Sequence, residues 1–399
     1  MKILSINAGS SSLKFTLFEL PEEKVLISGY FEKIGISDSF YSIKINGEKI
    51  KKEATLETHS DAVKILIDEL LNYKVINSLD EIDGIGHRIV HGGDKFSSSV
   101  IISDEVIDVV RELIPLAPLH NPANLIGIEA FKNALPNTPM VGVFDTAFHQ
   151  TMPEENYLYS VPYSWYRDYK IRKYGFHGTS HKYITKVMQE KLGKENINII
   201  NAHVGSGGSL CCVKDGKCFD TTMGFSPNAG ITMGTRCGDI DYSIIPFYME
   251  KTNTSLKDVD TILNKQSGLL GISEKFSDHR DIEAAISEGD RLSTLANNIY
   301  VNKVAEYIAK YFLELEGNVD AITLTAGTGE NAANFRAELV EKLACFGIKL
   351  DKEVNNSIAG FKDVHEGVIT TSDSKIPVYV IPTDEELMIA LDTYNLINQ

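Results

Sequence analysis

Short apolar runs separated by a polar turn open the chain and predict a β-hairpin. The run KILSI (residues 2–6) leads into the turn NAGSSS, and a second apolar run, LKFTLFEL (residues 13–20), follows. Two such runs across a small turn are typical of antiparallel strands. Glycine and serine are ordinary turn residues, but a turn of small hydroxyl residues beside Lys14 also suits an anion. The hydrophobic pattern alone leaves both interpretations open.

Beyond a further β-rich stretch that ends near residue 50, helical and strand periods alternate, which predicts an α/β fold. Helices of the first half are expected to start at Ser60, at Ser103, and at Asn121 with Pro122 behind it. Strands are expected at 81–90 and 139–145. The second of these is apolar almost throughout, so we expect it to be buried on both faces with Asp145 at its carboxyl end.

The second half continues the alternation. A Gly-rich loop at 173–180 precedes a helix capped by Thr179 or Ser180 and closed by Gly193. A long helix is expected at about 295–316, and the segment 319–343 reads as strand, Gly-rich loop and helix. The last strand leads into a helix with a capping box formed by Thr383 and Glu386.

The two halves of the chain contain similar segments, as an internal repeat would. INAGSSSLKFTLFELPEEKV near the start resembles INAHVGSGGSLCCVKDGKC, in which an apolar strand, Ile-Asn-Ala, a Gly/Ser turn and a second strand recur in order. Coincidence is one explanation, and a duplicated domain is the other. Duplication predicts two similar α/β lobes with a cleft between them, each lobe opening with a hairpin.

Charge and composition remove several classes of function. The net charge of −16 argues against a nucleic-acid partner, which would require a basic face. No apolar run approaches the ~20 residues of a membrane helix, and the first residues lack a signal-peptide pattern, so we expect a cytoplasmic protein. The five cysteines lack CxxC spacing, and we therefore expect reduced core thiols rather than a zinc site.

Three Gly-rich turns are candidates for phosphate contacts. They are the hairpin turn after residue 6, HVGSGGS (residues 203–209), and AGTGENAA (residues 326–333). The sequence GxxxxGK[ST] is absent, so a nucleotide would not bind through a P-loop. Each turn alone is weak evidence, but three in one chain favour a nucleotide, since backbone N–H groups at a helix start attract anions.

Charged side chains near these turns suit phosphoryl transfer, which needs positive charge around the moving group and a metal ion. The candidates are Arg88, Arg236, Asp145, His177 and His120. Each also has a plain structural alternative: a surface ion pair for Arg236, a cap or turn for Asp145, and a helix-start role for His120. His177 and His181 are four apart, but HExxH is absent, so an oxyanion donor is preferred to a zinc ligand. A Ser–His–Asp hydrolase built on residues 10–12 lacks GxSxG and is disfavoured.

Eight motifs together resemble the acetokinase family of short-chain acyl kinases. They are INAGSSSLK, GHRIVHGG, LAPLHNPAN, FDTAFHQTMP, RKYGFHGTSHKY, MGTRCGDID, TAGTGEN and IPTDEEL, in the family's order from end to end. The resemblance implies two duplicated ribonuclease H-like lobes of the acetate and sugar kinase/heat-shock/actin superfamily. The N-terminal lobe would comprise 1–147 and 383–399 and hold acetate and metal; the C-terminal lobe, 148–382, would bind nucleotide and dimerise. ATP and Mg²⁺, with Mn²⁺ as an alternative ion, would serve phosphoryl transfer to acetate in a homodimer.

The resemblance also assigns residues. Catalytic roles fall to Asp145, His177, Arg236 and His120, acetate binding to Arg88, Val90, Leu119, Phe176 and Pro227, and metal binding to Asn7 and Glu385. Nucleotide contacts are expected from Lys14, Ser10, Ser12, His203, Val204, Gly205, Ser206, Gly207, Asp278, His279, Arg280, Gly327, Thr328, Gly329, Glu330 and Asn331. Glu386 is left as the capping partner.

Three departures from the family pattern leave alternatives open. Ser206 replaces an Asn near the phosphates, Asn228 and Ala229 lie in SPNAG where TPLEG is usual, and Thr328 replaces an Ile. The middle change puts the acyl chain length in doubt, because one methylene is worth only about 1–3 kcal/mol of discrimination. A propionate or butyrate kinase is therefore the alternative, followed by a non-catalytic actin-like nucleotide-binding protein.

Overall fold

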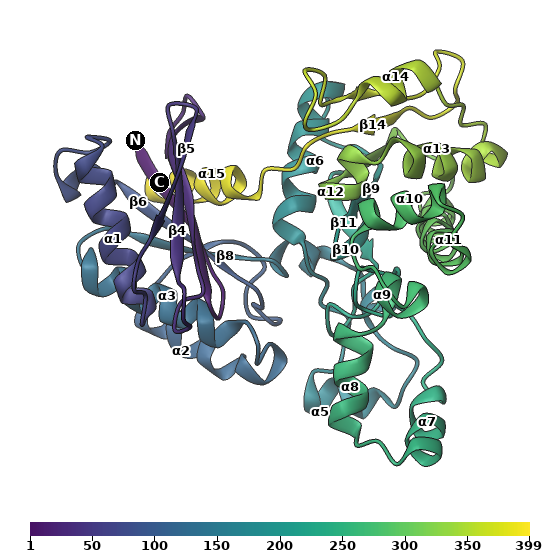
Figure 1. The fold of residues 1–399 in the computed structure, drawn as a ribbon, viewed down its shortest axis with the longest axis horizontal. Coiled ribbons are helices and arrows are strands. Elements are labelled where there is room, and N and C mark those ends of the chain that lie inside the picture. The colour runs from purple at the N-terminus through teal and green to yellow at the C-terminus, as the bar shows by residue number, and fades with distance from the viewer. The chain divides into compact units, whose positions relative to one another are not determined.

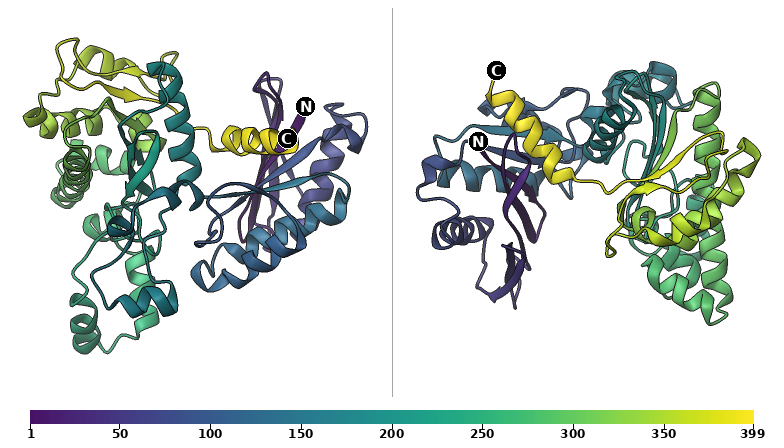
Figure 2. Two further views of the ribbon diagram at one scale, coloured as in Figure 1. Left: turned by 180° about the vertical axis from the view of Figure 1, so that it is seen from behind. Right: turned by 90° about the horizontal axis from the view of Figure 1, so that it is seen from above.

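The computed structural model describes residues 1–399 and divides into two compact units. We call Met1–Gln150 together with Asp384–Gln399 the N-terminal unit, and Thr151–Thr383 the C-terminal unit. Both chain termini belong to the N-terminal unit, and Figure 2 shows the yellow C-terminal helix beside the purple N-terminal strands. None of the helices combines the length and apolar composition that crossing a bilayer requires.

An eight-stranded mixed sheet forms the centre of the N-terminal unit (Figure 1). Its strands are β1 (Lys2–Ala8), β2 (Ser12–Glu19), β3 (Lys24–Glu32), β4 (Phe40–Ile45), β5 (Glu48–Glu53), β6 (Gly84–Ile89), β7 (Val100–Ile101) and β8 (Met140–Phe144). Their order is β5-β4-β3-β2-β1-β6-β8-β7. Strands β1 to β5 are antiparallel, whereas β6 is parallel to β1 and β8 is parallel to β6. The predicted opening hairpin is confirmed, with Asn7 of β1 opposite Lys14 of β2.

The helices of the N-terminal unit pack on both faces of this sheet. They are α1 (His59–Asn72), α2 (Asp104–Glu112), α3 (Asn121–Ala134) and α15 (Glu385–Ile397). Side chains alternate along β6, so its two faces meet different helices. A Cβ on Gly86 would lie 2.6 Å from Cγ2 of Ile389 on α15, whereas the His87 ring lies 5.5 Å from that of Phe131 on α3. Glycine on one face of β6 therefore allows α15 to approach closely.

Local hydrogen bonding corrects two of the predicted helix starts. Thr58, rather than Ser60, caps α1, because its hydroxyl accepts from the third helical N–H and the acid there returns a bond to the cap. Ser103 caps α2 as predicted. At α3 the N-cap position falls on His120, and Asn121 is the first helical residue.

A six-stranded sheet of the same plan forms the centre of the C-terminal unit. Its strands are β9 (Ile199–Val204), β10 (Gly208–Lys214), β11 (Lys217–Thr221), β12 (Ala321–Thr325), β13 (Gly367–Val368) and β14 (Val378–Val380). The order β11-β10-β9-β12-β14-β13 repeats β3-β2-β1-β6-β8-β7, including the parallel pairs and the antiparallel edge strand. The duplication predicted from the echoed hairpins is confirmed at the level of topology.

Helices surround the second sheet and complete its core. They are α4 (Glu154–Tyr157), α5 (Tyr163–Tyr169), α6 (Gly178–Leu192), α7 (Ile244–Thr252), α8 (Leu256–Lys265), α9 (Gly268–Ser273), α10 (His279–Ser287), α11 (Arg291–Glu314), α12 (Ala326–Asn331), α13 (Ala333–Lys342) and α14 (Lys352–Ser357). One stripe of α11 (Tyr300, Val304, Ile308) packs into a core shared with β9, β10 and β12. Helix α11 begins four residues earlier than predicted, behind Asp290.

Two further predictions for the C-terminal unit are corrected and one is confirmed. The cap of α6 is His177, in a left-handed conformation (φ 55°), rather than Thr179 or Ser180. Gly193 closes α6 as predicted. The segment expected to be a Gly-rich loop after β12 is the short helix α12, which follows the strand directly.

The clustered cysteines lie in the core of the C-terminal unit, as expected. Cys211, Cys212 and Cys218 are buried, and the Sγ atoms of Cys211 and Cys218 are 3.5 Å apart. Burial raises the pKa of both Cys211 and Cys212. Their neutral thiols therefore act as small apolar side chains in the core.

Candidate active site

Arg88 and Asp145 form an ion pair at one edge of the N-terminal sheet. Arg88 lies near the end of β6 and Asp145 directly follows β8, and the parallel pairing of these strands brings both side chains together. Arg88 Nε donates to the two carboxylate oxygens of Asp145 at 3.2 and 3.0 Å, and Arg88 Nη1 donates to Asn7 Oδ1 at 3.3 Å. Burial alone would lower the pKa of Arg88, but the Asp145 carboxylate outweighs it and raises that pKa. The guanidinium therefore stays charged.

Glu385 adds a second, half-buried carboxylate, in the first turn of α15. Its Oε1 atom is buried and has no hydrogen-bond partner. Burial raises the pKa of Glu385 to about 7; the charge of Arg88 lowers it, and that of Asp145 raises it again. The unpartnered oxygen of Glu385, the amide oxygen of Asn7 and the carboxylate of Asp145 are the kind of oxygen ligands that Mg²⁺ prefers. These residues fit a hard divalent cation.

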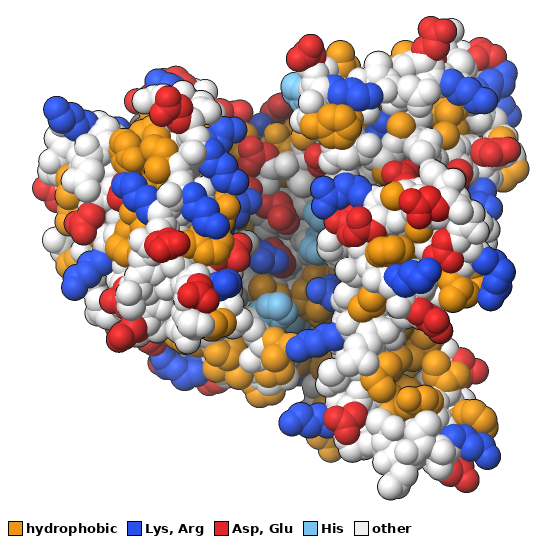
Figure 3. Space-filling view, viewed as in Figure 1, with side chains coloured by type: hydrophobic (Ala, Val, Ile, Leu, Met, Phe, Trp, Pro, Cys, Tyr) orange, Lys and Arg blue, Asp and Glu red, His pale blue; other side chains and the backbone are white.

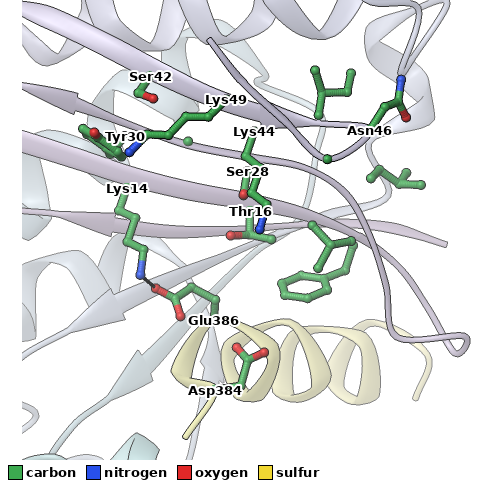
Figure 4. A pocket seen from close by; sticks show the side chains of 16 residues that line it. Lys14, Thr16, Ser28, Tyr30, Ser42, Lys44, Asn46, Lys49, Asp384 and Glu386 are labelled. Atoms are coloured by element: carbon green, nitrogen blue, oxygen red, sulfur yellow. Dashed lines mark ion pairs between the residues drawn. The ribbon is translucent and has the colours of Figure 1, made fainter. Parts of the chain in front are cut away.

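The start of α15 corrects the predicted capping box. Asp384 is the N-cap, and its carboxylate accepts from Leu387 N at 2.8 Å, so the helix begins one residue later than a Thr383 cap would require. Glu386 instead forms an ion pair with Lys14, as Figure 4 shows. Lys14 extends from β2 beside a groove of about 710 Å³ that strands β2 to β5 line. Its ammonium is half-exposed and already neutralised by one carboxylate.

The hairpin turn between β1 and β2 carries Ser10 and Ser12. Gly9 N donates to Ser12 O at 2.9 Å, and a Cβ on Gly9 would lie 2.8 Å from Ser12 Oγ. A side chain at Gly9 would therefore displace that hydroxyl. The turn is also held from α3, because Asn124 Nδ2 donates to Ala8 O at 2.9 Å.

Asn124 is a functional candidate that the sequence reasoning missed. It is 3% exposed, and its Oδ1 accepts from Val90 N at 3.0 Å while its Nδ2 holds the end of β1. The neighbouring Asn121 makes the matching bonds to the backbone of His91. The sequence does place two Asn residues three positions apart at the start of this helix. Asn is uncommon inside a helix unless its side chain has a hydrogen-bond partner, so this spacing could have indicated that both side chains bond elsewhere in the fold.

The residues expected around the acyl group fall in both units. Val90 is 6% exposed at the end of β6, whereas Leu119 is 71% exposed just before α3, next to the exposed His120. Phe176 is 3% exposed and Pro227 half-buried, both in the C-terminal unit. Within the N-terminal unit, the helix start places Leu119 and His120 in solvent-accessible positions.

A cluster of histidines lies where β9 and β10 meet the start of α6. The ring centroids of His177 and His203 are 4.2 Å apart. His177 Nδ1 lies 3.2 Å from Ser209 Oγ, and His203 Nδ1 lies 2.8 Å from Ser180 Oγ. A non-glycine residue at positive φ is uncommon, and such strain clusters at functional sites. His177 therefore has a strained backbone, and its ring is held by the Ser209 hydroxyl and by packing on His203.

Arg236 approaches the same place from a separate loop. A Cβ on Gly207 would lie 3.5 Å from Arg236 Nη1 and 3.6 Å from His177 Nε2. Arg236 Nη1 donates to Pro227 O at 3.1 Å, and burial lowers the pKa of Arg236. The β9–β10 turn thus runs past a guanidinium and an imidazole, both of which can donate to an oxyanion.

A cavity of about 900 Å³ collects most of the residues predicted to contact nucleotide. Of these, Gly205, Ser206, Asp278, His279, Arg280, Gly327, Thr328, Glu330 and Asn331 line it, and His203, Val204, Gly207 and Gly329 do not. Glu330 Oε1 accepts from Ala326 N and Thr383 N at 2.7 and 3.1 Å, so this carboxylate holds the start of α12. Its contribution to the cavity is structural.

Seven lining residues were not predicted from the sequence, and three of them have large side chains from elements outside the Gly-rich turns. Tyr300 reaches the cavity from α11, Glu283 from α10 with a buried and unpartnered Oε1, and Phe361 from the loop after α14 with 79% of its surface exposed. Asn331 Oδ1 accepts from Gly360 N at 2.7 Å and so ties that loop to α12. None of the three stands in a Gly-rich motif, and only the fold brings them to the cavity.

Two sheets of one duplicated strand order, each with helices packed around it, define an α/β protein of two similarly built units. Comparison with known proteins narrows the class. The family model described as the acetokinase family matches residues 2–391. The chain belongs to the acetokinase family, and with it to the phosphotransferases that act on a carboxyl group.

Individual relatives agree with this placement. The chain is 51% identical over 399 residues to an acetate kinase of Bacillus cytotoxicus, covering 100% of this chain and 99% of the relative. The solved structure of Porphyromonas gingivalis acetate kinase is similar with a TM-score of 0.94 at 44% identity, covering 99% of both chains. A propionate kinase structure from Francisella tularensis follows with a TM-score of 0.92 at 41% identity, again over 99% of both chains.

Proposed function

We propose that this chain is an acetate kinase that transfers the γ-phosphoryl group of ATP to acetate, reversibly, giving acetyl phosphate and ADP. The observation that carries this proposal is the 51% identity to acetate kinases along the whole chain. In the reaction a carboxylate oxygen of acetate attacks the γ-phosphorus as the bond to the β–γ bridging oxygen breaks. No covalent enzyme intermediate is needed, so positioning and electrostatics carry the acceleration.

In this proposal the N-terminal unit supplies the groups for acetate and metal. Arg88 is a charged donor whose orientation Asp145 fixes through a two-point contact. The guanidinium would hold the acetate carboxylate while Asp145 keeps it from turning. Asn7 and Glu385 would hold Mg²⁺, or Mn²⁺ as an alternative, and Asp145 would orient a ligand of the ion. Bound there, the cation would neutralise negative charge on the phosphates.

The C-terminal unit supplies the nucleotide site and the donors for the phosphoryl group. Two features support this: the cavity beside α12, and the Gly205–Gly207 turn flanked by His177 and Arg236. His177 and Arg236 would stabilise the charge that develops on the equatorial oxygens. The exposed ring of Phe361 at the cavity offers a face on which a base can stack.

Hydroxamate formation tests the proposal directly. Purified protein with Mg-ATP and hydroxylamine is given acetate, propionate or butyrate in turn, with an acid-free ATPase control. We expect the strongest product with acetate. No acyl hydroxamate with any acid, despite ATP binding, would refute the proposal.

A propionate kinase is the second candidate. The similarity to the Francisella tularensis propionate kinase supports it, as does the Asn228-Ala229 departure near the expected acyl pocket. Product with propionate well above product with acetate in the same assay would favour this candidate, and the phosphotransfer mechanism would stand.

We also propose a homodimer formed through the C-terminal unit. Apolar side chains stand out from the surface at α7 and α8, as Figure 3 shows for the orange atoms over these helices. Tyr242, Phe247 and Leu256 are 80%, 63% and 64% exposed. A contiguous apolar patch of this kind marks an interaction surface. Light scattering on Phe247→Asp, compared with the wild-type protein, tests this assignment, and an unchanged dimer mass would contradict it.

A further inference from the structure

A buried row of hydrogen bonds runs through the C-terminal unit and ends at His177. Thr323 Oγ1 donates to Asn201 Oδ1 at 2.7 Å, and Asn201 Nδ2 lies 2.8 Å from His181 Nδ1. His181 Nε2 lies 2.8 Å from Ser209 Oγ, which is 3.2 Å from His177 Nδ1. Residues 201, 209 and 181 are each 0% exposed, so water does not take the place of any of these partners.

The direction of the row follows from the amide at its centre. An amide nitrogen only donates, so His181 Nδ1 must accept and the proton of a neutral ring sits on Nε2. That Nε2–H donates to Ser209 Oγ, which leaves the serine hydrogen to point at His177 Nδ1. We propose that Asn201, His181 and Ser209 are positioning residues that hold His177 as the Nε2–H tautomer.

The tautomer matters because of what His177 Nε2 faces. This atom and Arg236 Nη1 lie on the same side of the β9–β10 turn, at 3.6 and 3.5 Å from the place a Gly207 Cβ would take. With the proton on Nε2, the imidazole is a donor toward that place, as a developing oxyanion requires. With the proton on Nδ1, it would present a lone pair and repel the same oxygen.

Because the row is buried, each of its hydrogen bonds must be made, and all of them must run in the same direction. If the side-chain amide of Asn201 were flipped, its oxygen would face His181 Nδ1, which would then have to carry a proton. The hydrogen bonds from His181 to Ser209 and from Ser209 to His177 would then run in the opposite direction. Because an unmade buried hydrogen bond is costly, all bonds of the row keep one common direction, and the bond from Thr323 Oγ1 to Asn201 Oδ1 sets it. The strained backbone of His177 (φ 55°) and its packing on His203 fix the ring at the end of the row.

The first test removes the hydroxyl of Ser209, which is the donor next to His177. In Ser209→Ala we expect kcat for acetyl phosphate formation to fall about tenfold, with the KM values for ATP and acetate within twofold. Ser209→Thr keeps a hydroxyl and should restore most of the activity. Thr185→Val is the matched control, because Thr185 is a buried residue of α6, the helix that carries His181, and its hydroxyl donates to the His181 carbonyl rather than to a side chain of the row. An unchanged kcat in S209A would overturn the proposal.

The second test reads the proton directly in the wild-type enzyme. In ¹⁵N-histidine-labelled wild-type enzyme, long-range ¹H–¹⁵N correlation, assigned with His177→Gln, should show His177 protonated at Nε2 and not at Nδ1. Finding the Nδ1–H form overturns the proposal. The kinetic test rests on the proposed function, but this one does not. A chain that makes no acetyl phosphate yet shows the Nε2–H form would refute the function and leave the row of hydrogen bonds intact.

Discussion

Gly207→Ala is the sharpest single perturbation that the structure offers. Gly207 lies in the β9–β10 turn and is not among the residues at positive φ, so alanine fits its backbone. The nearest atoms to the new methyl would be Arg236 Nη1 at 3.5 Å and His177 Cε1 and Nε2 at 3.6 Å. These are ordinary van der Waals distances, and no neighbour has to move.

The expected effects on stability and on activity therefore separate. A glycine replaced by alanine in a compatible conformation stabilises a protein by roughly 0.4–1 kcal/mol, because the unfolded chain loses freedom. Catalysis should suffer, since a methyl in van der Waals contact with both donor atoms overlaps the space that an oxyanion needs at about 2.7–3.1 Å from each donor. Loss of one such donor costs roughly 10²–10³ in kcat, so we expect at least a hundredfold loss.

Two measurements decide the outcome for G207A. Urea unfolding should give a free energy equal to or slightly above that of the wild-type protein, and the hydroxamate assay at saturating ATP and acetate should give the fall in kcat. Arg236→Ala serves as the reference for a missing donor. A G207A enzyme with near-normal kcat would refute the assignment of His177 and Arg236 to the transferred phosphoryl group.

Three further perturbations test other parts of the site and core. Arg88→Ala should raise the KM for acetate and destabilise the fold by about 3–5 kcal/mol, because the buried Asp145 carboxylate loses the guanidinium charge beside it; unchanged urea unfolding would contradict this. Phe361→Ala should raise the KM for ATP about tenfold through lost stacking and leave the KM for acetate unchanged, with Val364→Ala of the same loop as control. Burial raises the pKa of Glu314 to about 7 from its ordinary 4.5, so the folded protein retains a proton that the unfolded chain releases and stability falls as pH rises between these values. Glu314→Gln should therefore gain stability relative to wild type between pH 5 and pH 8, and a pH-independent difference in unfolding free energy would refute this.

Much of the fold could be predicted because local signals and tertiary structure agree. The two echoed hairpins, the alternating periods and the helix ends at Ser103 and Gly193 depend on neighbours in the sequence. The duplicated strand order follows from these elements, since each hairpin continues into the same pattern of parallel strands. Positions of Arg88 and Asp145 at strand ends were also predictable for this reason.

The remaining features depend on residues that meet only in the folded chain. His177 caps α6 because its backbone adopts a left-handed conformation, which no propensity assigns to histidine. Glu386 pairs with Lys14 across more than three hundred residues, so the capping box that its spacing suggested does not form. Phe361 lines the 900 Å³ cavity from a loop that Asn331 ties to α12 through the backbone N–H of Gly360.

The duplicated hairpins place an Asn in two different environments. The Ile-Asn-Ala of β1 and that of β9 occupy equivalent strands, yet β1 ends one residue after Asn7 whereas β9 continues for three residues beyond Asn201. Asn7 therefore lies at the sheet edge, where its Oδ1 meets Arg88, and Asn201 lies inside the strand at 0% exposure, bonded to His181. Although β9 is one residue shorter than β1 overall, it extends two residues farther past its Asn, so His203 and the Gly205–Gly207 turn lie at the end of β9, as Asn7 lies near the end of β1. The point at which the strand ends relative to its Asn thus separates a half-buried amide beside Arg88 in the N-terminal unit from a fully buried amide beside His181 in the C-terminal unit.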